Sequence, residues 1–82
     1  PKGNRMNVTI IGTGYVGLTT GVALAYVGHN VTCVDKNPRI VETLQAGRAT
    51  IHEPGLEELL ARAKPHLRVQ TDIPDLSGHG AV

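Results

Sequence analysis

The chain of 82 residues has little of what marks several functional classes. It contains no tryptophan or phenylalanine and only two tyrosines, and seven acidic residues balance eight basic ones. Without a basic stripe or interleaved aromatics, the sequence does not favour a nucleic-acid surface. Its apolar runs are too short to span a membrane, and no cationic segment leads into a signal core. We therefore expect a cytoplasmic protein that binds neither nucleic acid nor membrane.

Cysteine and metal-ligand patterns are equally sparse. Cys33 is the only cysteine, which excludes an internal disulfide, and its place in a predicted strand indicates a buried, reduced thiol without a catalytic role. The four histidines fall in predicted turns without a metal-ligand spacing. The chain also has no internal repeat or low-complexity tract. We expect neither a metal site nor a catalytic residue within these 82 residues.

Glycine, in contrast, is abundant, and one glycine-rich segment carries the strongest pattern. The sequence Gly-Thr-Gly-Tyr-Val-Gly at 12–17 follows an apolar strand predicted over Val8 to Ile11 and opens a helix predicted over Tyr15 to Val27. Asp35 ends the next predicted strand, about 20 residues beyond Gly14, as the dinucleotide-binding fingerprint requires. The alternative, a glycine-rich turn that binds nothing, is disfavoured because strand, helix and acidic residue occur together.

Each of the three glycines has a separate expected role. Gly12 allows a sharp turn, Gly14 lets a pyrophosphate approach the backbone, and Gly17 lets the helix lie close to the strand. The phosphates would then meet unpaired N–H groups at the helix N-terminus. The segment therefore predicts a phosphate-binding turn.

The acidic residue indicates which dinucleotide is bound. Asp35 is expected to accept hydrogen bonds from both ribose hydroxyls of an adenosine and to repel a 2′-phosphate, which favours NAD over NADP. Lys36 and Arg39 are close enough in sequence to attract that phosphate, so NADP stays the alternative. Lys36 either lies along the adenosine or extends into solvent, and Tyr15 either covers the pyrophosphate or packs at the helix start. The residues predicted to bind the cofactor are Gly12, Thr13, Gly14, Tyr15, Val16, Gly17, Asp35 and Lys36.

The remaining pattern alternates helices and strands. A short apolar run over Val31 to Val34 predicts a parallel strand covered on both faces, and Asn37 is the expected N-cap of a helix over Pro38 to Ala46. A strand over Leu67 to Thr71 follows, and after a turn-rich connection a fourth begins at Ala81. This order indicates an α/β fold with a Rossmann-type parallel sheet and flanking helices.

The number of strands limits how much of that fold is expected. A complete Rossmann domain has six strands, so we expect only its first half here, as a partial domain over residues 6–82. The five residues before Met6 are expected to be a tail or a vector-derived remnant.

Three glutamates follow in a further predicted helix. The helix is expected to begin near Glu53 and to end at Pro65, with Glu53, Glu57 and Glu58 in its first turn. Acids at that position are stabilised by the helix dipole, which explains them better than paired carboxylates for acid–base chemistry.

Several segments together resemble the UDP-glucose 6-dehydrogenase family. The resemblance begins with Met6 to Leu18, Gly28 to Val31 and Val34 to Asn37. The sequence Glu-Pro-Gly-Leu-Glu-Glu-Leu-Leu at 53–60 is more distinctive, and residues 71–73 match a third segment. The chain departs from the family pattern at residues 49–52 and around residues 74–79, which leaves the exact nucleotide sugar open.

The resemblance implies an enzyme that oxidises the C6 alcohol of UDP-glucose to a carboxylate in two NAD-dependent steps, with a cysteine nucleophile and a lysine. The family's catalytic residues are expected beyond Val82, so this chain would bind the adenosine and pyrophosphate half of NAD. Its implied partners are NAD, a nucleotide sugar and further copies of itself in a homo-oligomer. The alternatives are a GDP-mannose or UDP-N-acetylmannosamine dehydrogenase, or a non-catalytic NAD-binding module.

Overall fold

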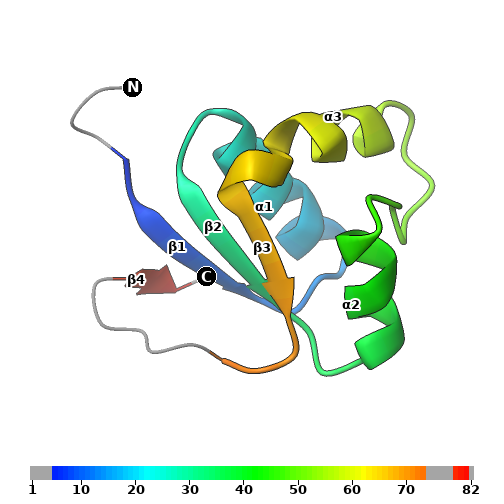
Figure 1. Ribbon diagram of the computed structural model, residues 1–82, viewed down its shortest axis with the longest axis horizontal. Helices are drawn as coiled ribbons and strands as arrows, with labels where there is room; N and C mark the ends of the chain where they lie inside the picture. The colour runs from blue at the N-terminus through cyan, green and yellow to red at the C-terminus, as the bar shows by residue number, and fades with distance from the viewer. Residues whose placement is uncertain (1–4, 74–78, 82) are drawn as a thin grey trace.

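A computed structural model describes residues 5–73 and 79–81 of the chain. In this part the chain forms one four-stranded sheet, three α-helices and a short 3₁₀ helix (Figure 1). The elements in chain order are β1 (Asn7–Ile11), α1 (Tyr15–Tyr26), β2 (Asn30–Val34), α2 (Pro38–Gln45), α3 (Leu56–Ala63), the 3₁₀ helix η1 (Lys64–His66), β3 (Leu67–Gln70) and β4 (His79–Ala81).

The sheet has the order β3-β2-β1-β4, and each neighbouring pair is parallel. Asn7 of β1 lies opposite Asn30 of β2 on one side and opposite His79 of β4 on the other. The chain thus adds β2 and β3 on one side of β1 and then crosses to place β4 on the other side. This order confirms the predicted Rossmann-type parallel sheet. Ligands of such sheets bind outside the carboxyl ends of the strands where the order reverses, which here is at β1.

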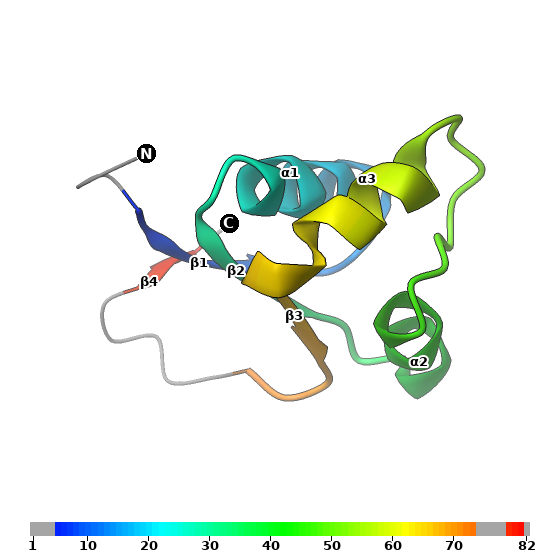
Figure 2. The same ribbon diagram turned by 45° about the horizontal axis from the view of Figure 1, so that its top comes forward.

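The helices α1 and α3 lie together over one face of the sheet, and α2 lies beside its β3 edge (Figures 1 and 2). The predicted apolar face of α1 is confirmed, because Leu18, Val22 and Ala25 have no exposed surface. The helix lies so close to the sheet that a Cβ on Gly21 would come within 2.8 Å of the Cys33 sulfur. Cys33 is buried as predicted, and burial raises the pKa of its thiol to about 11.

The helices α2 and α3 extend the same core. Val41 and Leu44 of α2 and Leu56 and Leu60 of α3 are each at most 5 % exposed. The side-chain amide of Gln45 also donates a hydrogen bond to the carbonyl of Val69 at 2.8 Å. The end of α2 thereby pairs a polar group of the edge strand β3 that would otherwise be open to another chain.

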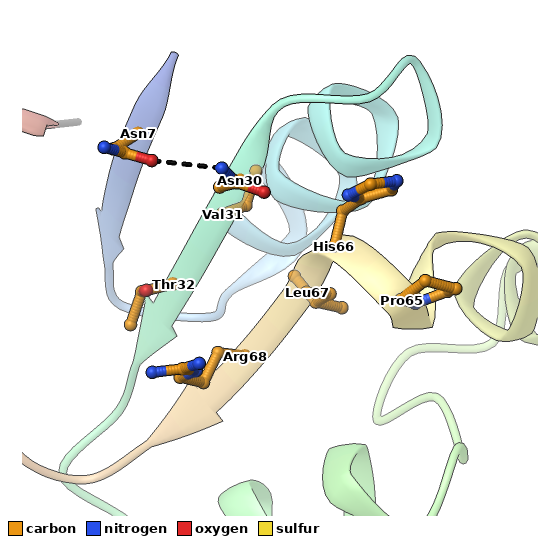
Figure 3. Close-up of a pocket in the computed structure, with 8 residues that line it drawn as sticks. All are labelled: Asn7, Asn30, Val31, Thr32, Pro65, His66, Leu67 and Arg68. Carbon is orange, nitrogen blue, oxygen red and sulfur yellow. Dashed lines mark hydrogen bonds between the residues drawn. The ribbon is translucent and has the colours of Figure 1, made fainter. Parts of the chain in front are cut away.

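Among the described residues the two faces of β2 are covered unequally, so the prediction from its apolar run holds only in part. Val31 and Cys33 are buried beneath the helices, whereas Thr32 is only half-buried and Asn30 is exposed. Because side chains alternate along a strand, Asn30, Thr32 and the exposed Arg68 of β3 belong to the opposite face. Val34 lies on that same face and is only 3 % exposed, so the face is open at Asn30, half-buried at Thr32 and buried at the end of the strand (Figure 3).

The start of α3 differs from the prediction. The helix begins at Leu56, so Glu53 lies before it, while Glu57 and Glu58 do occupy its first turn. The cause is Gly55, whose φ of +82° cannot belong to a right-handed helix. Glu57 has an additional structural role, because its carboxylate accepts the Ala49 N–H at 3.0 Å.

Other boundaries shift by one or two residues. The helices α1 and α2 end one residue earlier than predicted, at Tyr26 and Gln45, and β3 ends at Gln70. The strand β4 begins at His79 rather than Ala81, because its pairing with β1 starts opposite Asn7. The predicted connection before it falls largely on residues 74–78, which lie outside the described residues.

Candidate cofactor-binding site

The glycine-rich turn lies at the carboxyl end of β1, where the strand order reverses. Gly12 has a φ of +93°, a conformation that L side chains rarely adopt, and its N–H donates to the Val34 carbonyl at 2.7 Å. Gly14 then takes the N-cap position of α1. The sharp turn predicted for Gly12 is confirmed, and it directs the start of α1 to the edge where a ligand of this fold binds.

The other two glycines of the turn have opposite surroundings. A Cβ on Gly17 would overlap the backbone oxygen of Gly12 and approach the Ile10 side chain to 3.2 Å, so glycine is needed for close packing. A Cβ on Gly14 would meet no atom within 4 Å. Packing within the described part of the chain therefore explains Gly17 but not Gly14.

The open space over Gly14 lies at the N-terminus of α1, where it leaves room for a ligand. The first N–H groups of a helix have no intrahelical partner, and Gly14 brings no side-chain cap to α1. Tyr15 and Val16 are 55 % and 72 % exposed, so the start of the helix is accessible. The turn thus has the donors and the space that a pyrophosphate requires.

Asp35 lies beside this turn at the end of β2, and protein donors hold its carboxylate. Oδ2 accepts the Thr13 hydroxyl at 2.6 Å and the Thr13 N–H at 3.1 Å, while Oδ1 accepts the Asn37 N–H at 2.9 Å. The hydrogen bond from the Thr13 hydroxyl is the main reason that the pKa of Asp35 lies below its ordinary value, and the bond from Asn37 is the next. The carboxylate is therefore ionised at neutral pH.

Sequence reasoning named Thr13 and Asp35 but did not pair them. They lie 22 positions apart, and the fold joins them because β1 and β2 are neighbours that end at the same edge. The sequence feature that could have indicated this pair is Thr13 itself, a hydroxyl donor between the first two glycines of the turn. Asn37 was predicted as the cap of α2 and is confirmed in that role, since its side chain accepts the Arg39 N–H at 2.9 Å. Its own N–H, which binds Asp35, links the carboxylate to the start of α2.

The exposed Lys36 also acts on Asp35, because its positive charge lowers the pKa of the carboxyl group. Arg39 is exposed in the first turn of α2. The contacts of all eight predicted residues with a cofactor stay predictions.

A hollow of about 490 Å³ lies elsewhere, next to the starts of β1, β2 and β3 (Figure 3). Asn7, Asn30 and Leu67, the first residues of these strands, help to line it. It is at the amino ends of the strands, opposite to the edge that carries Gly12 and Asp35, so it is not part of the candidate site.

The described residues contain no group of three or more histidine, cysteine, aspartate or glutamate side chains placed to hold a metal ion. No helix in the described ranges is long and apolar enough to cross a membrane.

Comparison with known proteins gives the family. The model of the UDP-glucose/GDP-mannose dehydrogenase family, NAD binding domain, matches residues 6–80. Over 57 residues the chain is 53 % identical to UDP-glucose 6-dehydrogenase YwqF of Bacillus subtilis. This aligned segment covers 70 % of this chain and 13 % of that protein. Over 72 residues it is 47 % identical to UDP-glucose 6-dehydrogenase AglM of Haloferax volcanii, covering 87 % of this chain and 17 % of that protein.

Solved structures agree with the sequence comparison. The UDP-glucose dehydrogenase of Pyrobaculum islandicum matches 84 % of this chain with a TM-score of 0.77 and 47 % identity. The UDP-N-acetyl-mannosamine dehydrogenase Cap5O of Staphylococcus aureus matches 82 % with a TM-score of 0.79 and 36 % identity. The match covers 17 % of each of these two longer chains. The chain belongs to the UDP-glucose/GDP-mannose dehydrogenase family, and its glycine-rich turn and Asp35 lie in that family's NAD-binding domain.

Proposed function

We propose that this chain binds the adenosine and pyrophosphate half of NAD in an enzyme that oxidises UDP-glucose to UDP-glucuronate in two NAD-dependent steps. The observation that carries the proposal is the open space over Gly14 next to the ionised carboxylate of Asp35. The names of the relatives support the choice of UDP-glucose.

In this proposal the residues of the turn bind and orient the cofactor. The N–H groups of Tyr15, Val16 and Gly17 donate to the pyrophosphate, helped by the positive end of the α1 dipole. Asp35 accepts from the adenosine ribose and repels a 2′-phosphate, and Lys36 lies alongside. Bound NAD would supply a hydride acceptor, which no side chain offers.

A different nucleotide sugar is the second candidate. The fold match to the UDP-N-acetyl-mannosamine dehydrogenase of Staphylococcus aureus is as good as the match to a UDP-glucose dehydrogenase, so the NAD-binding part does not separate the two. Homo-oligomerisation and a cytoplasmic location complete the proposal.

Calorimetric titration of the chain with NAD and NADP tests the cofactor. We expect NAD to bind more tightly than NADP, because the phosphate of NADP would approach an ionised carboxylate. Equal affinities in the unmutated protein would contradict the role of Asp35. Oxidation assays with UDP-glucose, UDP-N-acetylmannosamine and GDP-mannose, made on the enzyme that carries this domain, test the substrate.

A further inference from the structure

We propose that Thr13 is a positioning residue, which holds Asp35 so that a single acceptor position, on Oδ1, is left for a ribose hydroxyl of NAD. The inference rests on the proposed cofactor function and adds to it how the carboxylate is oriented. It also narrows the sequence-based expectation that Asp35 accepts from both hydroxyls.

The number of acceptor positions on the carboxylate leads to this inference. An ionised carboxylate has about four lone-pair sites, two on each oxygen. The Thr13 N–H and the Thr13 hydroxyl both bind Oδ2 and fill it. The Asn37 N–H binds Oδ1 and leaves one of its sites free. A ligand hydroxyl that donates to Asp35 without displacing a protein donor must therefore bind Oδ1.

Thr13, rather than Asn37, determines the position of the carboxylate relative to the turn. The contact from Asn37 is local, two residues along the chain, and moves with Asp35. Thr13 belongs to the glycine-rich turn and is only 3 % exposed, so its hydroxyl is kept from water and bound to Oδ2. The turn that would receive the pyrophosphate thus also orients the group that would receive the ribose. Groups held in place before binding cost less entropy on binding.

Two variants with a matched control separate positioning from packing. Thr13→Val removes the hydroxyl and keeps the branched shape, and Thr13→Ser restores the hydroxyl. Thr43→Val is the control, because the Thr43 hydroxyl donates to the Arg39 carbonyl within α2 and takes no part in the site. The charge of Lys36, which also lowers the pKa of Asp35, is present in all of them.

The first measurement is a carboxyl ¹³C NMR titration of Asp35, which needs no cofactor. In the unmutated protein we expect the pKa below 3.8, the ordinary value, and in Thr13→Val we expect it to rise. Thr13→Ser and Thr43→Val should leave it low. A wild-type pKa at or above the ordinary value, or one that Thr13→Val leaves unchanged, would overturn the proposal.

The second measurement is calorimetric titration with NAD at several pH values. We expect Thr13→Val to weaken NAD binding about tenfold, the effect of a lost hydrogen bond to a charged group, and Thr13→Ser to restore it. Because only the ionised carboxylate binds well, affinity should fall on acidification, and in Thr13→Val the fall should begin at a higher pH. Undiminished affinity in Thr13→Val, with weak binding in Asp35→Ala, would also overturn the proposal. If the expected pKa pattern is found but wild-type protein does not bind NAD, the cofactor function is wrong and the orientation of Asp35 by Thr13 stands.

Discussion

At the scale of single residues, we expect Gly14 to be needed for cofactor binding and Gly17 for folding. They lie on the same turn, but a Cβ on Gly17 would overlap a backbone oxygen whereas a Cβ on Gly14 would enter open space. Backbone atoms cannot move aside as the end of a flexible side chain can. The two positions should therefore respond differently to the same kind of change.

We expect Gly14→Val to abolish NAD binding with the fold retained, because the added side chain occupies the approach of the pyrophosphate. The matched variant Gly17→Ala should destabilise the fold by about 1–3 kcal/mol or more, since the overlap forces α1 away from β1. Circular dichroism during urea unfolding and calorimetric titration with NAD measure the two effects. A folded Gly14→Val protein that binds NAD normally would show that the turn is only structural.

Asp35→Ala should weaken NAD binding by about 1.5–3 kcal/mol, the contribution of a hydrogen bond to a charged group, and should reduce the preference over NADP. Asp35→Asn is the control for charge, because it keeps a similar shape without repelling a 2′-phosphate. Titrations of both variants with both cofactors check this. An unchanged ratio of NAD to NADP affinity in Asp35→Asn would mean that charge does not set the preference.

At the scale of elements, Gly21 lets α1 pack closely against Cys33 of β2. Alanine is favoured over glycine inside a helix by about 1 kcal/mol, whereas overpacking a core costs about 1–3 kcal/mol. A Cβ on Gly21 would come within 2.8 Å of the Cys33 sulfur, so the cost should exceed the gain.

Gly21→Ala should therefore destabilise the protein by up to about 2 kcal/mol. Adding Cys33→Ala removes the sulfur that the new Cβ would approach. The double variant should therefore be more stable than the sum of the two single effects predicts, by a coupling energy of at least about 0.5 kcal/mol. Urea unfolding of the four proteins of this cycle gives the coupling. Additive effects would show that another contact limits the approach of α1.

Because Cys33 is buried, the free energy of unfolding should fall as the pH rises into the alkaline range. Its pKa is raised from 9.0 to about 11, so the folded protein holds the thiol proton more firmly than the unfolded chain. The stabilisation is complete below pH 9 and is lost as the pH rises to about 11, by on the order of 2–3 kcal/mol. Urea unfolding across this range, compared with Cys33→Ala, should show a steeper loss in the unmutated protein. Equal slopes would contradict the raised pKa.

At the scale of the whole molecule, the chain spans less than a fifth of the length of the relatives cited above. The family resemblance implies a cysteine nucleophile, but Cys33 is buried beneath α1 and its raised pKa keeps it protonated. A thiol must be accessible and ionised to attack a substrate. The chain can therefore contribute to cofactor binding without contributing that nucleophile.

We expect the 82-residue chain alone to show no reduction of NAD with UDP-glucose. Absorbance of the reduced cofactor, followed with purified chain, NAD and UDP-glucose, measures this directly, and Cys33→Ala serves as the control for the buried thiol. Sustained turnover that survives removal of contaminating dehydrogenase would show that the catalytic groups lie within these residues.

Features that depend on neighbouring residues could be predicted from the amino-acid sequence. The turn at Gly12, the apolar face of α1 and the cap at Asn37 follow from backbone freedom, helical periodicity and a side-chain acceptor, all of which act within a few positions. The strand–turn–helix context made the glycine pattern specific for a dinucleotide. These features sufficed to predict the fold class, whereas the family came from the resemblance of longer segments, above all residues 53–60.

Which distant groups meet depends on how the strands pair and the helices pack. The order β3-β2-β1-β4 brings the carboxyl ends of β1 and β2 to one edge, and there the Thr13 hydroxyl binds Asp35. The start of β4 at His79 likewise follows from its pairing with β1, and the exposure of Asn30 in β2 from the placement of the helices over the other face of the sheet. Strand pairing and packing join residues far apart in the chain, and no local preference encodes which two will touch.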